Sequence, residues 1–141
     1  MRVTNRRARY NYRLFDKYEA GVSLTGAEVK AIRNGRANIS SAYAKIINSE
    51  VYLVNANIQV KGVKDYDPLR TRKLLLNKAE IISIQTKIKQ KKLTLVPTKL
   101  YTRGRLIKIE IALAKTKRKF EKKEAIKKKD IEREIAKELK E

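Results

Sequence analysis

Apolar and polar residues alternate along several short segments of the chain, and a period of two is typical of a β-strand with one buried face. The clearest example is residues 106–114, where Ile107, Ile109, Ile111 and Leu113 share one face. Strand-like patterns recur at short spacing over residues 10–18, 41–47, 50–54, 58–63 and 93–102. About six short strands at this spacing predict a mainly β protein with a closed or nearly closed antiparallel barrel.

Turn and proline residues add detail to these strands. Asn48-Ser49 separates two of them and indicates a hairpin. The alternation changes parity near Asp16, which predicts a bulge or bend, and Pro97 predicts an edge or bulge position because proline has no N–H to donate. Residues 1–9 are polar and basic, and we expect them to form a loosely held lead-in.

Two short helices are predicted from their capping residues. Thr25–Glu28 is a capping box, in which each of the two end side chains bonds the backbone N–H of the other residue, and Gly35 is suited to end the helix. This box is interpreted as structural. Asn77 caps a second helix, whose apolar face is formed by isoleucines at positions 81, 84 and 88.

The segment Asp67–Leu76, with the sequence DPLRTRKLLL, combines cations with leucines. Its Asp-Pro pair favours the start of a third helix. Such a helix would direct Arg70, Arg72 and Lys73 outward, while the leucines at positions 69 and 74–76 would anchor it to the core. The segment is therefore interpreted as a cationic platform attached to a folded domain.

The composition changes after Ala114. Residues 115–141 are rich in Lys, Glu and Ile, and their single narrow apolar stripe (Ile131, Ile135, Leu139) cannot form a core of its own. We predict a barrel domain over residues 1–114 and a basic tail over residues 115–141. The tail is expected to be disordered when free and helical when bound.

The charge is strongly positive. The chain has 36 Lys and Arg against 15 Asp and Glu, a formal net charge of +21, and 24 of the basic but only 8 of the acidic residues lie in residues 1–114. The folded domain itself is therefore cationic, which favours RNA, DNA or an anionic membrane face as partner. On such a domain, Arg70, Arg72 and Lys73 favour contact with nucleic-acid phosphates over a merely solvated face.

Several classes of function are disfavoured. The chain has no Cys and no His, which excludes disulfides, thiol chemistry, His-based catalysis and His or Cys zinc sites. We find no nucleophile–base pair, glycine-rich phosphate loop or metal-ligand spacing, so we expect no enzyme, cofactor or metal. An apolar run of 18 or more residues is absent, and arginines at positions 6, 7 and 9 interrupt any signal-peptide core, so a cytoplasmic location is expected.

Five groups of residues, in order and over essentially the whole chain, resemble the SmpB family, the tmRNA-binding (SsrA-binding) proteins of bacteria. They are Asn5–Arg9; Tyr18–Gly21 with Leu24–Lys30; Asp67–Leu76; Leu95–Pro97 through Tyr101; and Ala112–Lys115 with Lys117–Lys119. Each motif alone is weak, but together they are specific.

The resemblance implies an OB-like barrel that binds the elbow of the tRNA-like domain of tmRNA and delivers it to stalled ribosomes for trans-translation. It implies RNA-binding roles for Asn5, Glu19, Leu75 and Lys108. It also implies that the tail enters the decoding site and message channel, that the protein is a monomer in the complex, and that no membrane is involved. The expected ribosome-contacting residues are Lys115, Lys117, Arg118, Lys119, Glu121, Lys122 and Lys123.

The chain departs from the family pattern in its histidines and in its tail motif. Tyr10 stands where the family usually has His, and the His that the family often has near Tyr66 is absent too. A role of imidazole protonation is therefore not expected here, whereas Tyr10 could still stack. Glu121-Lys122-Lys123 replaces Asp-Lys-Arg, which keeps the charge but loses the planar fork of Arg. An equally basic ribosomal or ribosome-assembly protein is the alternative; an RNA-modifying enzyme or nuclease would need catalytic residues that the chain does not group.

Overall fold

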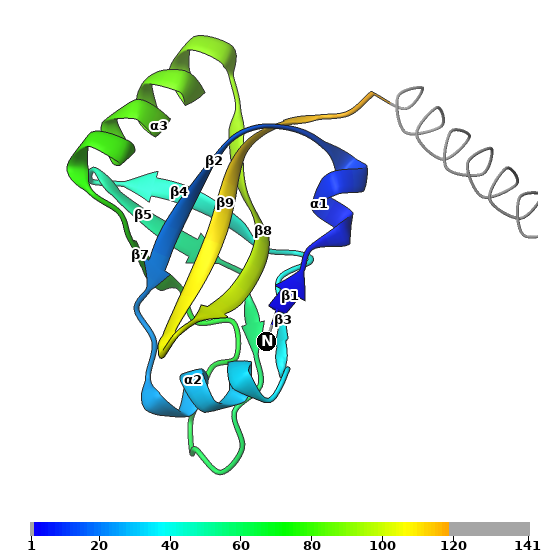
Figure 1. The fold of residues 1–141 in the computed structure, drawn as a ribbon, viewed down its shortest axis with the longest axis vertical. Coiled ribbons are helices and arrows are strands. Elements are labelled where there is room, and N and C mark those ends of the chain that lie inside the picture. The colour runs from blue at the N-terminus through cyan, green and yellow to red at the C-terminus, as the bar shows by residue number, and fades with distance from the viewer. Residues whose placement is uncertain (1, 119–141) are drawn as a thin grey trace, which may run out of the picture.

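The computed structural model describes residues 2–118, and its centre is a closed barrel of six antiparallel strands (Figure 1). The strands are β2 (Tyr12–Val22), β4 (Tyr43–Ile47), β5 (Glu50–Val54), β7 (Arg72–Leu75), β8 (Thr94–Arg103) and β9 (Leu106–Thr116). They pair in the order β8-β4-β5-β7-β2-β9, and the pairing of β9 with β8 closes the ring. The predicted mainly β, six-stranded barrel is confirmed.

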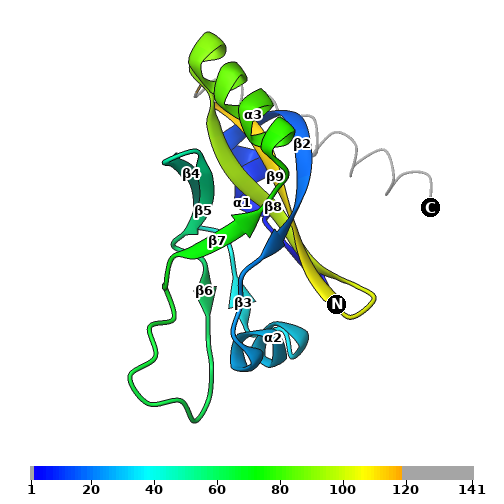
Figure 2. The same cartoon turned by 90° about the vertical axis from the view of Figure 1, so that its left-hand side faces the viewer.

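The remaining elements surround this barrel. They are β1 (Arg2–Thr4), α1 (Arg6–Asn11), α2 (Gly26–Arg33), β3 (Ala37–Asn38), β6 (Asn57–Ile58) and α3 (Lys78–Lys91). Strand β1 pairs with β8, while β3 and β6 form a separate two-stranded sheet. In both ribbon views α2 lies near one end of the barrel and α3 near the other (Figures 1 and 2). None of the described helices has the length and apolarity needed to cross a membrane.

The barrel interior is filled by the inward-facing residues of the strands. Val51, Ile109 and Ile111 are completely buried, and Ile32 of α2 and Ile84 of α3 join the same core. Each helix begins at its predicted cap: the Thr25–Glu28 capping box is present, and the Asn77 side chain accepts from the N–H of Glu80. These local predictions are confirmed because caps depend on neighbouring residues only.

Predicted irregularities in the strands are also confirmed. The β2–β9 register shifts between Leu14 and Lys17, and the β8–β9 register shifts between Pro97 and Lys99. Asn48 and Ser49 both have positive φ, as the tight β4–β5 hairpin requires. Strand β9 continues to Thr116, two residues beyond the predicted domain boundary.

Two terminal and loop predictions are wrong. Residues 2–11 are ordered rather than loosely held, because β1 pairs with β8 and the Asn5 side chain caps α1. The strand predicted over 58–63 is reduced to the two residues of β6, and the chain beyond it forms a loop through Gly62, whose φ is +76°.

The helix predicted in Asp67–Leu76 is also wrong. The Asp67 carboxylate closes a turn by accepting from the N–H of Leu69 at 2.9 Å, and residues 72–75 then form β7 between β5 and β2. In a strand, side chains alternate between faces, so Arg72 points inward and is fully buried, whereas Leu75 is 56% exposed. The predicted helix would place Arg72 on the outside and Leu75 against the core, and the structure shows the opposite arrangement.

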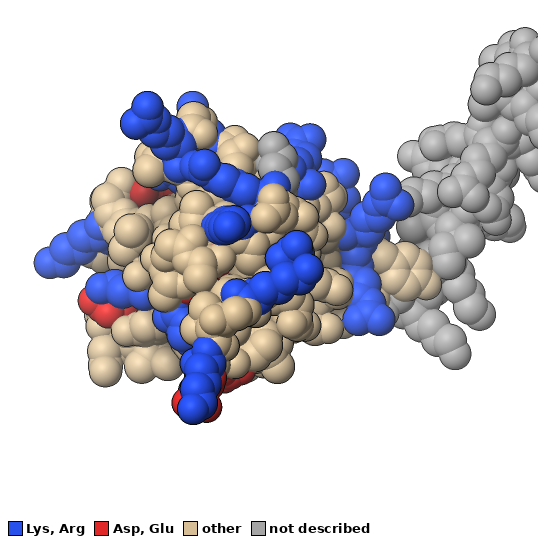
Figure 3. Space-filling model, turned by 90° about the horizontal axis from the view of Figure 1, so that it is seen from below, with Lys and Arg blue, Asp and Glu red and all other residues tan. Residues whose placement is uncertain are grey.

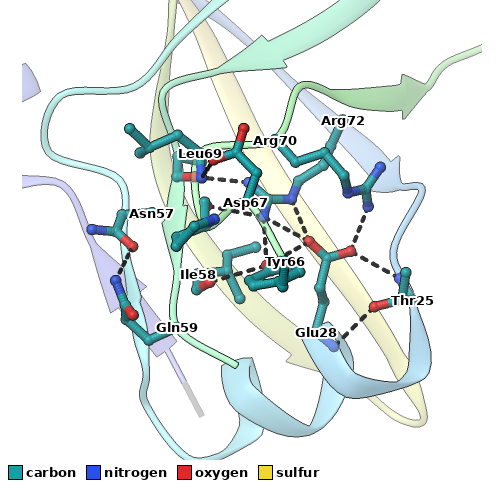
Figure 4. A network of polar contacts seen from close by, with 12 residues as sticks. Thr25, Glu28, Asn57, Ile58, Gln59, Tyr66, Asp67, Leu69, Arg70 and Arg72 are labelled. Atoms are coloured by element: carbon teal, nitrogen blue, oxygen red, sulfur yellow. Dashed lines mark hydrogen bonds and ion pairs between the residues drawn. The ribbon is translucent and has the colours of Figure 1, made fainter. Parts of the chain in front are cut away.

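Burial of Arg72 depends on Glu28, whose side chain is also fully buried (Figure 4). Arg72 Nε donates to Glu28 Oε2 at 2.7 Å, and Tyr66, Arg70 and the backbone N–H of Thr25 also donate to this carboxylate. Burial alone would raise the pKa of Glu28, but the hydrogen bonds outweigh it and lower the pKa from 4.5 to about 2. Glu28 therefore stays ionised inside the protein.

We predict that Glu28→Gln lowers the free energy of unfolding at pH 7 by about 3 kcal/mol, the value that corresponds to a pKa of about 2 in the folded and 4.5 in the unfolded state. This contribution is complete above pH 4.5 and is lost as the pH falls towards 2, so wild type and variant should converge there. Urea unfolding between pH 7 and 3 measures both effects. Asp65→Asn, at an exposed loop carboxylate, is the control and should change stability by less than about 0.5 kcal/mol. Equal stability of Glu28→Gln and wild type at pH 7 would contradict this account.

Candidate RNA-binding surface

Outward-facing residues from four strands of the barrel form one continuous row. Leu75 of β7 pairs with Gly21 of β2, Gly21 with Lys108 of β9, and Lys108 with Tyr101 of β8. Glu19 lies on the same side of β2, two residues before Gly21. We call these five residues the outer strip. The barrel thus brings together residues that lie up to 89 positions apart in the chain, from 19 to 108.

Gly21 gives the outer strip its shape. A Cβ atom at this position would lie 3.3 Å from the Cβ of Leu75, closer than most side chains tolerate. With glycine there, the Leu75 side chain lies over the β2 backbone while remaining 56% exposed. The result is a low apolar surface against which a flat base or ribose can pack.

Glu19 is held in place by two residues of β8. The Tyr101 hydroxyl donates to Glu19 Oε2, and Arg103 Nη1 lies 2.9 and 3.0 Å from the two carboxylate oxygens. The Tyr101 hydrogen bond, with Arg103 and Lys108 nearby, lowers the pKa of Glu19. Burial and the Glu19 hydrogen bond raise the pKa of Tyr101 to about 12. Glu19 is therefore an ionised acceptor in a fixed position, which repels phosphates but can accept from base N–H groups.

The outer strip combines different kinds of contact. Lys108 offers a cation for a phosphate, Glu19 an acceptor for a base edge, and Leu75 an apolar surface. Tyr101 positions Glu19. Such a set can bind and orient RNA, but it includes no residue activated for acid–base or nucleophilic chemistry.

A second basic region lies where β9 meets α1. The backbone N–H of Lys117 donates to the carbonyl of Asn11 at 2.9 Å, and Lys117 Nζ donates to the carbonyl of Arg9 at 3.0 Å. Lys115 pairs with Arg13 of β2, and both Lys115 and Arg118 are exposed. The chain therefore leaves the barrel beside α1, within a group of cations.

Lys and Arg side chains also project from the end of the barrel near α2. Figure 3 views this end, where Lys and Arg side chains project across the visible face and few Asp or Glu side chains are seen. Helix α2 contributes Lys30 and Arg33 and the loop after β6 contributes Lys61, all exposed. The cationic surface predicted for the barrel itself is confirmed.

The family model of the SmpB protein matches residues 2–141. The chain belongs to the SmpB family. The SsrA-binding protein of Gloeobacter violaceus is 47% identical over 136 residues, covering 94% of this chain and 90% of that protein. The SsrA-binding protein of Persephonella marina is 45% identical over 141 residues, covering 98% and 93%.

A solved structure described as "tmRNA-SmpB: a journey to the center of the bacterial ribosome" contains a chain that is 40% identical to this one. The two chains superpose with a TM-score of 0.69, over 89% of this chain and 94% of that chain. The OB-like barrel expected from the resemblance to the SmpB family is therefore confirmed.

The structure brings together three of the four positions inferred from the SmpB resemblance. Glu19, Leu75 and Lys108 share the outer strip, but Asn5 is only 2% exposed. The Asn5 side chain donates to the carbonyls of Ile39 and Pro97 and accepts from the N–H of Ala8. Asn5 thus acts as a support beneath the surface in this structure.

The cations predicted in Asp67–Leu76 separate from one another. Lys73 is exposed and forms an ion pair with Glu50 at 2.9 Å, Arg70 is 40% exposed beside Glu28, and Arg72 is buried. Of the predicted tail contacts, Lys117 contacts the backbone of α1, Lys115 pairs with Arg13 of β2, and Arg118 is exposed. Lys119, Glu121, Lys122 and Lys123 lie outside the described residues.

The sequence alone does not identify Tyr101, Arg103 and Gly21 as site residues. Tyr101 alternates with the buried Leu100 and so could be assigned to an outward face. Its contact with Glu19 could not be predicted, because the two residues are 82 positions apart and meet only through the pairing of β2 and β8 with β9.

We predict that Tyr101→Phe raises the pKa of the Glu19 carboxyl, because the largest cause of its lowering is the Tyr101 hydrogen bond. A pH titration of the Glu19 side-chain carbon by NMR measures this pKa. Tyr52→Phe is the matched control, since Tyr52 donates to Glu50 instead, and it should leave the pKa of Glu19 unchanged. An unaltered Glu19 titration in Tyr101→Phe would show that Tyr101 does not position this carboxylate.

Proposed function

We propose that this chain is a tmRNA-binding adaptor that delivers tmRNA to stalled ribosomes for trans-translation, in which incomplete nascent chains are tagged and released. The observation that carries the proposal is the outer strip, where Glu19, Leu75 and Lys108 meet on one exposed face of a cationic barrel. The SmpB match over nearly the whole chain supports the same role. The protein acts in the cytoplasm by binding, as one copy per complex, without catalysis or a cofactor.

The division of contacts follows from the chemistry of the surface. Lys108 and the exposed cations around the barrel supply phosphate contacts, which dominate affinity but do not depend on sequence. Leu75 and Glu19 respond to the shape and base edges of a folded RNA loop, which an ordinary duplex does not present in the same way. The tRNA-like domain of tmRNA offers such loops at its elbow.

Residues 115–141 form the ribosome-contacting part of the proposal. Lys117 joins the start of this segment to the backbone of α1, so the tail begins on a different part of the surface from the outer strip. We assign to the tail, including Glu121-Lys122-Lys123, the contacts with the decoding site and the message channel. Binding of tmRNA and recognition of the stalled ribosome are then separate steps.

A basic ribosomal or ribosome-assembly protein remains the competing function, because it would show a similar charge and barrel. Such a protein would bind ribosomal RNA through its whole basic surface, and it would have no need for a preference for tmRNA. The two functions are distinguished by removing the tail without disturbing the barrel.

We predict that a chain ending at Arg118 keeps its affinity for tmRNA within about twofold but loses tagging of nascent chains on stalled ribosomes. Ending at Arg118 retains all of β9 and the Lys117 contacts with α1. Filter binding measures affinity, and a reconstituted translation reaction on a message without a stop codon measures tagging. Leu75→Ala in the full-length chain is the reciprocal control and should weaken tmRNA binding. Loss of tmRNA binding in the truncated chain would overturn this division of roles.

A further inference from the structure

A groove whose described lining residues carry no charge lies beside the separate two-stranded sheet of β3 and β6. Its volume is about 360 Å³, and its lining consists of amides, hydroxyls and one leucine: Asn38, Ser40, Ser41, Asn55, Asn57 and Leu69. None of these residues belongs to the outer strip. A neutral, concave lining is unusual on a chain with a net charge of +21, and it is suited to a neutral ligand group.

Two of the amides have a fixed orientation. Asn38 Oδ1 accepts from the backbone N–H of Ser40 at 2.9 Å, and Asn57 Oδ1 accepts from Gln59 Nε2 at 2.7 Å. The oxygen of each amide is thus engaged, which leaves its NH₂ group as a donor. Asn38 and Asn57 are also directly paired across β3 and β6. The groove therefore presents two neighbouring amide donors.

Buried Arg72 donates hydrogen bonds to the backbone of two segments that line this groove. Its Nη1 donates to the carbonyl of Ala56 at 2.7 Å, between Asn55 and Asn57, and its Nη2 donates to the carbonyl of Pro68 at 3.1 Å, next to Leu69. Figure 4 shows Leu69 and Asn57 on the same side of this network. A buried ion pair is an expensive way to stabilise a small core, but it can fix backbone segments relative to one another.

Buried Asn5 donates a hydrogen bond to the backbone of a third segment that lines the groove. Its Nδ2 donates to the carbonyl of Ile39 at 3.0 Å, between Asn38 and Ser40, and to the carbonyl of Pro97 at 2.8 Å. The two predicted RNA-binding residues that lie inside the protein, Asn5 and Arg72, thus both support the backbone of the groove.

We propose that the groove is a second RNA site, which binds a single unstacked nucleobase carrying a carbonyl acceptor, that is uracil, guanine or cytosine. The Asn38 and Asn57 NH₂ groups donate to the base carbonyls, the serine hydroxyls supply further hydrogen bonds, and Leu69, which is 48% exposed, packs against the base. A phosphate is disfavoured because none of the described residues that line the groove is a cation. The cationic surface elsewhere holds the RNA chain near it. The inference rests on the proposed function only in that the ligand is RNA.

The test compares oligo(U) with oligo(A) of equal length, because adenine has no carbonyl group. Fluorescence anisotropy gives the ratio of the two affinities, in which the phosphate contribution cancels. The full-length chain should prefer oligo(U) roughly tenfold. Asn38→Asp should bring the ratio close to one, since it removes the donor but keeps the acceptor for the Ser40 N–H. Gln90→Glu, an exposed position on α3, makes the same charge change and should keep the wild-type ratio.

A ratio near one for the wild-type chain overturns the proposal, and so does a ratio that Asn38→Asp leaves unchanged. A groove that binds a peptide instead of a nucleobase would give these results. Chemical probing of uracil N3, guanine N1 and cytosine N3 then identifies the source of the base. Protection that is lost in Asn38→Asp supports the site in tmRNA if it occurs in the free tmRNA complex, and in ribosomal RNA if it occurs on the ribosome. No such protection in either complex refutes it. Affinity for tmRNA, measured separately, distinguishes this failure from failure of the proposed function.

Discussion

The ion pair between Glu28 and Arg72 is the interaction on which much of this small protein depends. Both side chains are fully buried, and they connect the start of α2 with β7 across the barrel end. Because an unpaired charge in this place would be very unfavourable, α2, β7 and the loops at Ala56 and Pro68 must fold together. The same carboxylate closes the capping box of α2, so local and long-range structure depend on one group.

This arrangement leaves the outer face of β7 available for binding. Arg72 and Leu74 point inward, and Lys73 and Leu75 consequently point outward. Leu75 can then lie over Gly21 beside Lys108, and Glu19 is held by Tyr101 and Arg103. In the proposed function, this barrel carries a surface whose selectivity depends on shape and on one oriented carboxylate, while affinity depends on distributed charge.

The sequence predicted those features that depend on nearby residues. The Thr25–Glu28 capping box, the hairpin at Asn48 and the bulge near Asp16 follow from local chemistry, and each is present. Residues 72–75 were assigned wrongly, because their cations and leucines also suit a helix and the deciding partner, Glu28, lies 44 positions from Arg72. For the same reason the roles of Tyr101 and Arg103 could not be predicted, since their contacts with Glu19 require the complete barrel.

The central claim is that the barrel selects tmRNA by shape and base contacts in addition to charge. Its most direct test is the affinity of the full-length chain for tmRNA and for an elongator tRNA over a range of salt concentrations. Both affinities should fall with similar slopes, because phosphate contacts are common to the two RNAs. We predict that tmRNA is bound more tightly at every salt concentration. Equal affinities throughout would contradict the claim and leave only a non-specific basic protein.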